Sequence, residues 1–438
     1  MPNAKKVLII TYYWPPSGGS GVQRWLHFSR YLAQLGWEPI IYTPENAEAP
    51  IEDKSLIDPF TESVHVIKYP IWEPFEAYKA LTGKKGKKLQ TGFLNEGGKQ
   101  DKKWIQKFAL WLRANLFIPD AKKFWIQPSI KHLRDFLKDH PVDIIVSTGP
   151  PHTTHLIALG LKRATGIPWL ADFRDPWTNI DWFDKLPMTK WAIRKHKRQE
   201  QAVLAEATGI TCVSRTWTKE FEALAQRPVK LITNGFAPKD FQHFEKKEDS
   251  NFTILHTGSL NADRNPLCFW SFLGEEIQRN ETLKSKLKIQ LVGAVDVSVI
   301  QSIESCGLSA YLDQRPFIPH EEVIELMSSC SLLLLPLNNV KNQQGIIPGK
   351  LFEYLASNQA ILAIGPKTGD SAQILQEQAQ TLVVDFDEKP TWTAIQEEDL
   401  KFTLYVANFQ NSSVGSVIFK NELRTWFNKK SLCRKNIY

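Results

Sequence analysis

The chain has 438 residues, which is more than one compact core usually holds and therefore favours two domains. Its hydrophobic fraction of 42% is ordinary for a globular protein, and no apolar run approaches the roughly 20 residues that span a bilayer. Five scattered cysteines form neither a zinc motif nor a disulfide framework, and the net charge of +7 accompanies no recognised nucleic-acid-binding module. The first apolar run is also too short for a signal peptide. We therefore expect a cytoplasmic protein with no nucleic-acid partner.

The first fifty residues predict a strand, a loop, a helix and a second strand. The apolar run 7–12 is typical of a buried parallel strand, and a loop rich in proline and glycine follows at 15–21. Apolar residues at helical spacing then lead to Gly36, which ends the helix before a strand at 40–42. This βαβ pattern is typical of a doubly wound sheet.

The same alternation resumes near residue 140 and again near residue 250. We predict further strands at 142–148, 168–171, 209–214, 231–235, 252–256, 287–292, 331–337, 360–364 and 381–384. A polar stretch rich in Lys, Asp and Glu separates the two sets of strands. We therefore expect an α/β protein with two Rossmann-like domains that face a cleft. Their expected bounds are 1–237 and 252–415, with a linker at 238–251 and a C-terminal helix at 416–438, which could pack back on the first domain or on the second.

Residues 84–125 interleave lysines with aromatic side chains. The aromatic members of this segment are Trp104, Trp111, Phe117, Phe124 and Trp125. Such a sequence suits a surface that rests on anionic lipid headgroups. A solvated loop followed by a core helix is the alternative for any single residue. For the whole segment we favour an inner-leaflet membrane surface or a lipid-linked substrate.

The stretch 345–356 opens from a glycine- and proline-containing loop into a helix. Gly349 precedes the helix, and Lys350 and Glu353 share one helical face. Free backbone N–H groups and a lysine at a helix start attract anions, and a carboxylate one turn later can accept hydrogen bonds from sugar hydroxyls. These groups predict a site for a nucleotide diphosphate. An ordinary amphipathic helix with both charged side chains in solvent is the alternative.

Other candidate residues follow predicted strands, because open α/β sheets bind ligands at the carboxyl ends of their strands. In the first half these residues are Gly18, Gly19, Gly21, His152, Asp172, Arg174 and Asp175. In the second half they are Gly258, Ser259, Arg264 and Phe317. The simpler alternatives are a plain glycine turn, a structural histidine, and a buried Arg174–Asp175 ion pair with Asp172 as a helix cap.

Arg264 and Lys350 together would neutralise a departing pyrophosphate. We identify no carboxylate cluster suited to Mg²⁺. We therefore expect no metal and no cofactor, and a nucleoside diphosphate that departs without a metal ion.

These motifs resemble glycosyltransferase family 4. The elements that carry the resemblance are Pro15-Pro16 with the glycine loop, Thr233-Asn234-Gly235-Phe236, Gly258-Ser259-Leu260 and the 350–356 helix. They cover nearly the whole chain in the family's order. The family consists of retaining transferases with the GT-B architecture of two Rossmann-like domains.

The resemblance implies roles for several residues. Arg264 and Lys350 would bind the donor diphosphate, Glu353 the ribose, and the chain around Phe317 would flank the base. The glycine loop would lie near the phosphate and the acceptor. The first domain would thus bind the acceptor and the second domain the nucleotide-sugar.

The chain departs from the family pattern at two places. Gly345 stands eight residues before Glu353, where the family usually has a second glutamate. The segment 172–175 replaces a histidine that is common in the family, so that Asp175, Arg174 or His152 would take its role. The expected function is sugar transfer to a glycan or lipid-linked acceptor in surface polysaccharide synthesis. A nucleotide-sugar 2-epimerase and a non-catalytic nucleotide- or glycan-binding subunit are the alternatives.

Overall fold

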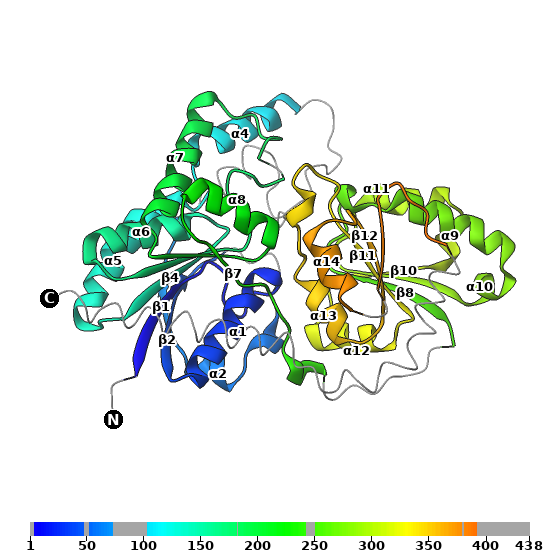
Figure 1. The fold of residues 1–438 in the computed structure, drawn as a ribbon, viewed down its shortest axis with the longest axis horizontal. Helices are drawn as coiled ribbons and strands as arrows, with labels where there is room; N and C mark the ends of the chain where they lie inside the picture. The colour runs from blue at the N-terminus through cyan, green and yellow to red at the C-terminus, as the bar shows by residue number, and fades with distance from the viewer. Residues whose placement is uncertain are drawn as a thin grey trace. The chain divides into compact units, whose positions relative to one another are not determined.

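The computed structural model describes residues 4–47, 52–72, 103–181, 183–241, 250–378 and 381–391 (Figure 1). These residues divide into two compact units, unit 1 within residues 1–233 and unit 2 within residues 234–419. Part of the expected linker, residues 242–249, lies outside the described residues. The expected C-terminal helix at 416–438 lies outside them as well.

Unit 1 is built on a parallel sheet with the strand order β3-β2-β1-β4-β5-β6-β7. Its strands are β1 (Lys5–Ile10), β2 (Trp37–Pro44), β3 (His65–Tyr69), β4 (Ile144–Gly149), β5 (Trp169–Phe173), β6 (Gly209–Cys212) and β7 (Lys230–Leu231). Its helices are α1 (Ser20–Gln34), α2 (Pro59–Ser63), α4 (Lys103–Leu116), α5 (Ile126–Asp139), α6 (Thr153–Thr165), α7 (Lys190–Glu206) and α8 (Arg215–Ala225). In Figure 1, α1 and α2 lie on one side of the sheet and α5 to α8 on the other. The direction of the strand order reverses between β1 and β4.

The central strands of unit 1 form because their side chains are apolar on both faces. In β1 the residues Val7, Leu8, Ile9 and Ile10 are fully buried, and Leu8 pairs in register with Ile40 of β2 and with Ile145 of β4. A strand that is covered by helices on both faces needs such a continuous apolar run.

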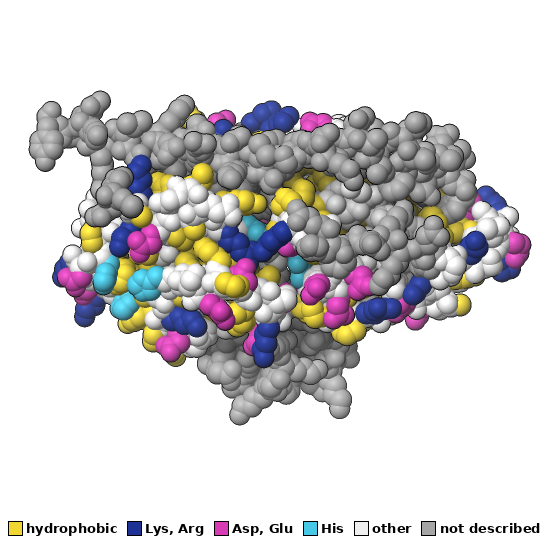
Figure 2. Space-filling view, turned by 90° about the horizontal axis from the view of Figure 1, so that it is seen from below, with side chains coloured by type: hydrophobic (Ala, Val, Ile, Leu, Met, Phe, Trp, Pro, Cys, Tyr) yellow, Lys and Arg dark blue, Asp and Glu magenta, His cyan; other side chains and the backbone are white. Residues whose placement is uncertain are grey.

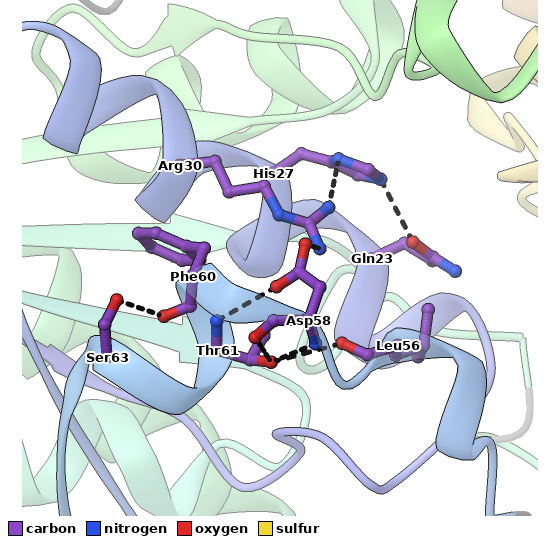
Figure 3. Close-up of polar contacts among 8 residues, drawn as sticks. All are labelled: Gln23, His27, Arg30, Leu56, Asp58, Phe60, Thr61 and Ser63. Atoms are coloured by element: carbon purple, nitrogen blue, oxygen red, sulfur yellow. Dashed lines mark hydrogen bonds and ion pairs between the residues drawn. The ribbon is translucent and has the colours of Figure 1, made fainter.

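A polar cluster fixes the short helix α2 against α1 (Figure 3). Asp58 accepts a hydrogen bond from the Thr61 backbone N–H at 3.0 Å, and the Thr61 hydroxyl accepts one from the Asp58 N–H at 2.7 Å. This reciprocal pair is a capping box. Asp58 also pairs with Arg30 of α1 at 2.7 Å, so one carboxylate both caps α2 and joins it to the neighbouring helix.

Unit 2 is built on a second parallel sheet with the order β10-β9-β8-β11-β12-β13. Its strands are β8 (Phe252–Thr257), β9 (Leu287–Val292), β10 (Leu312–Arg315), β11 (Leu332–Pro336), β12 (Ala360–Ile364) and β13 (Thr381–Val384). Its helices are α9 (Leu267–Arg279), α10 (Glu281–Lys286), α11 (Val297–Ser305), α12 (His320–Ser329), α13 (Lys350–Ala356) and α14 (Asp370–Gln376). The strand order reverses between β8 and β11.

Each face of the second sheet carries its own apolar core. On one face Ile254 and Ile289 pack with α9 residues such as Trp270. On the other face Leu255 packs with Met327 of α12 and Leu351 of α13. Neighbouring residues of β8 therefore point to opposite faces, as the alternation of side chains along a strand requires.

The expected α/β class with two Rossmann-like domains is confirmed by these two sheets. Among the helices that the structure describes, none combines the length and the apolar character that crossing a membrane requires. On the face seen in Figure 2, acidic and basic side chains are interspersed between the grey atoms and are not segregated by sign.

Candidate functional site

The candidate donor residues of unit 2 gather where the strand order reverses. Gly258 and Ser259 directly follow β8, Asn338 follows β11, and Lys350 begins α13. At such a reversal the chain leaves the two neighbouring strands towards opposite faces of the sheet, which opens space for a ligand. The sheet topology of unit 2 therefore explains why these residues meet.

Lys350 lies against the end of β8. Its Nζ donates a hydrogen bond to the Thr257 carbonyl oxygen and lies 3.3 Å from His256 Nε2. His256 Nδ1 lies 3.0 Å from the Leu334 carbonyl oxygen. Because a carbonyl oxygen only accepts, Nδ1 carries the proton of the imidazole and the Nε2 lone pair faces Lys350.

This environment disfavours the charged form of Lys350. Burial and the positive charge of Arg264 lower the pKa of Lys350 from 10.5 to about 7, although Glu353 opposes the change. Burial likewise holds the pKa of His256 well below 6.5, and the charge of Lys350 adds to this effect. An anion bound beside Lys350 would remove the disadvantage, because an opposite charge favours the protonated amine.

Arg264 is the second cation of this cluster. It ends a short 3₁₀ turn (Ala262–Arg264), where its Nε donates to Asn338 Oδ1 and its Nη1 donates to the Ser259 carbonyl oxygen at 3.2 Å. These bonds direct the guanidinium towards the ends of both β8 and β11. Arg264 is near enough to Lys350 for its charge to lower the pKa of Lys350.

Glu353 lies one turn after Lys350, and its Oε1 lies 2.9 Å from His320 Nε2. Phe317, in the loop before α12, is 45% exposed. Gly349 has an ordinary right-handed conformation, with φ −55° and ψ −38°. It therefore makes no use of the conformational freedom of glycine.

Two backbone amides near the start of α13 are already bonded. The Leu351 N–H donates to the Pro348 carbonyl oxygen at 3.0 Å, and the Phe352 N–H donates to the Gly349 carbonyl oxygen at 3.4 Å. The free amides that the sequence predicts for an anion are therefore limited at this place to those of Gly349 and Lys350.

Gly258 and Gly293 lie against each other at the ends of β8 and β9. Gly258 has φ +91° and Gly293 has φ +122°, a region that side chains rarely allow. A Cβ at position 293 would lie only 2.6 Å from the Gly258 carbonyl oxygen. A Cβ at position 258 would lie 3.0 Å from Lys350 Nζ. Glycine at position 258 thus makes room for Lys350, and glycine at position 293 makes room for the backbone of Gly258.

Carboxylates are arranged differently from the family pattern. Gly345 is buried in a 3₁₀ turn (Gln343–Gly345) and offers no side chain to a ligand. An Asp-x-Asp tripeptide at 385–387, which our metal prediction overlooked, follows β13 with both carboxylates exposed. Over the described ranges, no group of three His, Cys, Asp or Glu side chains is placed to hold a metal ion.

In unit 1, Asp172 belongs to the core. It lies in β5, is fully buried, and pairs with Arg24 of α1 through Oδ1 at 2.8 Å and Oδ2 at 3.1 Å. Trp25 Nε1, the Thr148 hydroxyl and the Thr211 hydroxyl also donate to it, at 2.7, 3.0 and 2.7 Å. Burial would raise the pKa of Asp172, but Arg24 and these donors lower it to about 2.

This network corrects two interpretations of the sequence. Asp172 is a strand residue and not a helix cap, and its ion-pair partner is Arg24. A carboxylate that four side chains enclose connects α1, β4, β5 and β6. The geometry therefore assigns Asp172 to the packing of unit 1 and not to catalysis.

Arg174 joins the glycine loop to the end of β4. Its Nη1 donates to the Gly21 carbonyl oxygen at 2.9 Å, and its Nη2 donates to the Pro150 carbonyl oxygen. Burial lowers the pKa of Arg174, while the charge of Asp175 opposes that change. A Cβ at Gly21 would lie 3.1 Å from Arg174 Nη1. The structure thus brings the predicted residues Gly21, Arg174 and Asp175 together.

Gly18 and Gly19 lie in the same loop before α1. Gly19 has φ +89° and is the residue that immediately precedes α1. That backbone conformation favours glycine and turns the chain from the loop into the helix.

His152 lies at the start of α6, where its ring stacks on Trp177 with centroids 4.6 Å apart and an interplanar angle of 1°. Trp177 Nε1 in turn donates to His196 Nδ1 at 3.1 Å. Neither ring nitrogen of His152 has a hydrogen-bond partner among the described residues, although the side chain is only 5% exposed. Burial holds the pKa of His152 well below 6.5, so the ring is neutral at pH 7.

The sequence did not reveal the partners of the candidate residues. These partners are Arg24 for Asp172, His256 for Lys350, His320 for Glu353, Asn338 for Arg264 and Trp177 for His152. The positions of His256 in a predicted strand and of His320 after a loop were visible. Their pairings with Lys350 and Glu353, which join residues 94 and 33 positions apart, were not.

Comparisons with known proteins agree with this geometry. Residues 105–235 match the family model of the glycosyl transferase 4-like domain. No curated protein matches the chain. Among solved structures, trehalose-6-phosphate synthase OtsA is similar with a TM-score of 0.62 and 11% identity over 99% of this chain and 100% of that one.

Two further structures share the fold. WaaG, a glycosyltransferase involved in lipopolysaccharide biosynthesis, has a TM-score of 0.54 and 13% identity over 95% of this chain and 98% of that one. A putative UDP-N-acetylglucosamine 2-epimerase from Listeria monocytogenes has a TM-score of 0.51 and 9% identity over 93% of this chain and 89% of that one. The chain therefore carries a glycosyl transferase 4-like domain at residues 105–235 and has the GT-B fold of such transferases.

Proposed function

We propose that the protein transfers a sugar from a nucleotide-sugar donor to a glycan or lipid-linked acceptor, with retention at the anomeric carbon. The observation that carries this proposal is the cluster of Lys350 and Arg264 at the strand reversal of unit 2. Burial and the positive charge of Arg264 disfavour the charged form of Lys350. A diphosphate that develops negative charge as it departs would be the ligand that best offsets this cost.

In this proposal unit 2 holds the donor. Lys350 and Arg264 neutralise the two phosphates without a metal ion, Glu353 accepts the ribose hydroxyls, and Phe317 flanks the base. Gly258, which leaves room for Lys350, lies in the same cluster with Ser259 and Gly349.

Unit 1 would bind the acceptor through the glycine loop and the residues that Arg174 joins to it. The neutral, unpartnered ring of His152 would take a hydrogen bond from a sugar hydroxyl or donate one. Surface polysaccharide synthesis is the setting that we propose, because WaaG shares the fold and acts in lipopolysaccharide biosynthesis.

The test is a transfer assay. Purified protein is incubated with UDP-, GDP-, ADP- and dTDP-sugars and a panel of glycan and lipid-linked acceptors, and the release of nucleoside diphosphate is measured. We expect one donor to give acceptor-dependent release, and we expect Lys350→Ala to abolish it. If no nucleoside diphosphate binds to the wild-type protein at millimolar concentration, the proposal is wrong.

A nucleotide-sugar 2-epimerase is the second candidate, since a structure with that name shares the fold. Conversion of the donor alone, without an acceptor, separates this activity from transfer.

A non-catalytic subunit is the third candidate, because Gly345 leaves the site without a second carboxylate. Retained cellular function in Lys350→Ala, with nucleotide binding lost, would favour that role.

We further propose that unit 1 rests on the cytoplasmic face of a membrane. Helices α4 and α7 lie side by side (Figure 1), and Asn115 joins them through bonds to the Pro187 carbonyl oxygen at 2.9 Å and the Thr189 N–H at 2.7 Å. The aromatic face of this pair consists of Trp104, Phe108, Trp111 and Trp191, which are 40–69% exposed.

Basic side chains flank the aromatic face. Lys195 Nζ lies 4.9 Å from the centroid of the Trp191 ring, and the charge of Lys195 contributes to the lowered pKa of Lys123, after burial. Exposed aromatic rings beside lysines suit the boundary between acyl chains and anionic headgroups. Residues 84–102, which belong to the same predicted segment, lie outside the described residues.

Vesicle flotation tests this part of the proposal. We expect the protein to float with phosphatidylglycerol vesicles and to dissociate at high salt. Substituting Trp104, Trp111 and Trp191 by alanine together should abolish flotation. The matched control is Leu267→Ala, which removes an apolar side chain that is 59% exposed in unit 2. Equal flotation of the triple variant and the control would contradict the proposal.

A further inference from the structure

The carboxylate of Glu353 is held by a side chain from another helix. His320 is the first residue of α12 and Glu353 lies within α13, and His320 Nε2 is 2.9 Å from Glu353 Oε1. Because an ionised carboxylate only accepts hydrogen bonds, Nε2 must carry a proton. The pair is therefore a directed hydrogen bond from the imidazole to one particular oxygen.

The second oxygen of Glu353 remains available. Across the described ranges, no hydrogen-bond donor reaches Oε2, and the Glu353 side chain is 23% exposed. The bond to His320 limits rotation of the carboxylate, and so it fixes the direction in which Oε2 points. A flexible glutamate would lose that freedom only on binding a ligand, which weakens binding.

The position of His320 is itself well defined. It follows Pro319 at the start of α12, and that helix packs on the sheet of unit 2 through the buried Met327. The backbone of His320 is thus fixed by a helix that does not contain Glu353. Such an arrangement holds a ligand-binding group more firmly than a contact within one helix.

We propose that His320 is a positioning residue that orients Glu353 to accept hydrogen bonds from the 2′- and 3′-hydroxyls of a donor ribose. The consequence is a site that prefers ribonucleotides to 2′-deoxyribonucleotides. This inference rests on the proposed function, since it assumes that unit 2 binds a nucleoside diphosphate.

The test is isothermal titration of the full chain with UDP, GDP and ADP and with their 2′-deoxy forms. We expect the wild-type protein to bind the best ribonucleotide about tenfold more tightly than its deoxy form, as the loss of one hydrogen bond to a charged acceptor implies. His320→Ala should bring the two affinities to within about threefold of each other, while Glu353 is still present. His320→Gln, which keeps an N–H donor, should restore part of the preference.

The control is Glu322→Gln, at an exposed position in the first turn of the same helix, and it should leave the preference unchanged. A merely structural ion pair would lower the melting temperature of His320→Ala without changing the ratio of the two affinities. If His320→Ala does not fold, His320→Gln is compared with Glu353→Gln. The quantity compared is the ratio of the affinities for the ribonucleotide and its deoxy form. Only Glu353→Gln should lose the preference for the ribonucleotide entirely.

The outcomes separate the two proposals. Absence of any nucleoside diphosphate binding in the wild type would overturn the proposed function and this inference with it. Binding with equal affinity for the ribo and deoxy forms, or an unchanged preference in His320→Ala, would overturn the inference alone.

Discussion

Lys350 is a lysine whose charge depends on what is bound beside it. Its pKa is lowered to about 7, by burial and then by the charge of Arg264. A bound diphosphate would return the pKa towards its ordinary value, so that above pH 7 binding requires uptake of a proton. The folding stability of the protein changes with pH in the opposite direction to its affinity for the diphosphate. Its free energy of unfolding should rise between pH 7 and 10.5, because the unfolded chain binds a proton there that the folded chain does not.

We therefore expect the affinity for the preferred nucleoside diphosphate to fall as pH rises above about 8, by up to roughly tenfold per pH unit. The terminal phosphate, whose second pKa is about 6, is already ionised over this range. Titration calorimetry in two buffers with different ionisation enthalpies measures the proton uptake directly. In Lys350→Met the residual binding should show no uptake, and a wild-type affinity that is constant from pH 8 to 10 would contradict this account.

Asp172 illustrates the opposite case, a carboxylate that stays charged while it is fully buried. Its pKa of about 2 means that the stabilisation it provides is complete above the ordinary value of 3.8 and is lost as pH falls towards 2. Asp172→Ala should lower the free energy of unfolding by about 3–5 kcal/mol, because it leaves Arg24 as an uncompensated buried charge. Urea denaturation measures this loss.

The double variant Asp172→Ala/Arg24→Met is the control for that experiment. It removes both charges and should recover a large part of the loss. A loss below about 1 kcal/mol in Asp172→Ala would show that the carboxylate is not needed for packing, and catalysis would then be its remaining explanation.

At the scale of single elements, α2 depends on its cap. This helix has only five residues, Pro59–Ser63, and none of its side chains is buried. Short helices gain little from their own hydrogen bonds, so the Asp58 capping box and its ion pair with Arg30 hold α2 in place.

Asp58→Ala should destabilise the protein by about 1 kcal/mol, since it removes the cap and the ion pair together. Asp58→Asn keeps a capping oxygen but not the charge, and it should cost only a few tenths of a kcal/mol. Chemical denaturation of the two variants compares these losses. Equal losses would mean that the ion pair, and not the cap, stabilises α2.

The strands that could be predicted are those rich in apolar residues. The strand at 360–364 agrees with β12 to the residue, because a strand covered by helices on both faces is apolar throughout. The strands at 287–292 and 381–384 agree equally with β9 and β13. We missed β3 and β10, each of which lies at one edge of its sheet. Their sequences, HVIKY and LDQR, mix polar and apolar residues and so carry no continuous apolar run.

The same physical distinction applies to the candidate site. Lys350, Glu353 and Arg264 could be found because glycine, proline and charge patterns reveal loops at strand ends. The hydrogen bonds that orient these residues could not be found, because they depend on which helices pack together. His256 illustrates this point. Its sequence position suggests only a strand residue, whereas its contacts with Leu334 and Lys350 arise from the pairing of β8 with β11 and the placement of α13.

At the scale of the whole molecule, two units of similar architecture carry different kinds of polar cluster. Unit 2 brings two cations and a glutamate to its strand reversal, whereas unit 1 brings a glycine loop, an arginine and a stacked histidine to its own. This difference supports a division of labour in which unit 2 binds the charged donor. The repetition of one fold therefore does not imply a repetition of one ligand.

Hydrogen–deuterium exchange of the full chain tests this division. On addition of saturating nucleoside diphosphate we expect slower exchange of the amides at 256–264 and 338–353, because a ligand that binds only the native state suppresses local opening around its site. Amides of α2 and of the sheet edge at β3 serve as the internal control and should be unchanged. Protection confined to unit 1 would contradict the assignment of the donor to unit 2.

The close contact between Gly293 and the backbone of Gly258 limits which substitutions this chain can accept. When two side chains collide, a smaller neighbour can restore the fit, and the pair can drift together through many combinations. At position 293 the obstacle is a peptide oxygen, which every amino acid possesses. Replacement of Gly293 should therefore be harmful in every genetic background, with no compensating change available at its partner position.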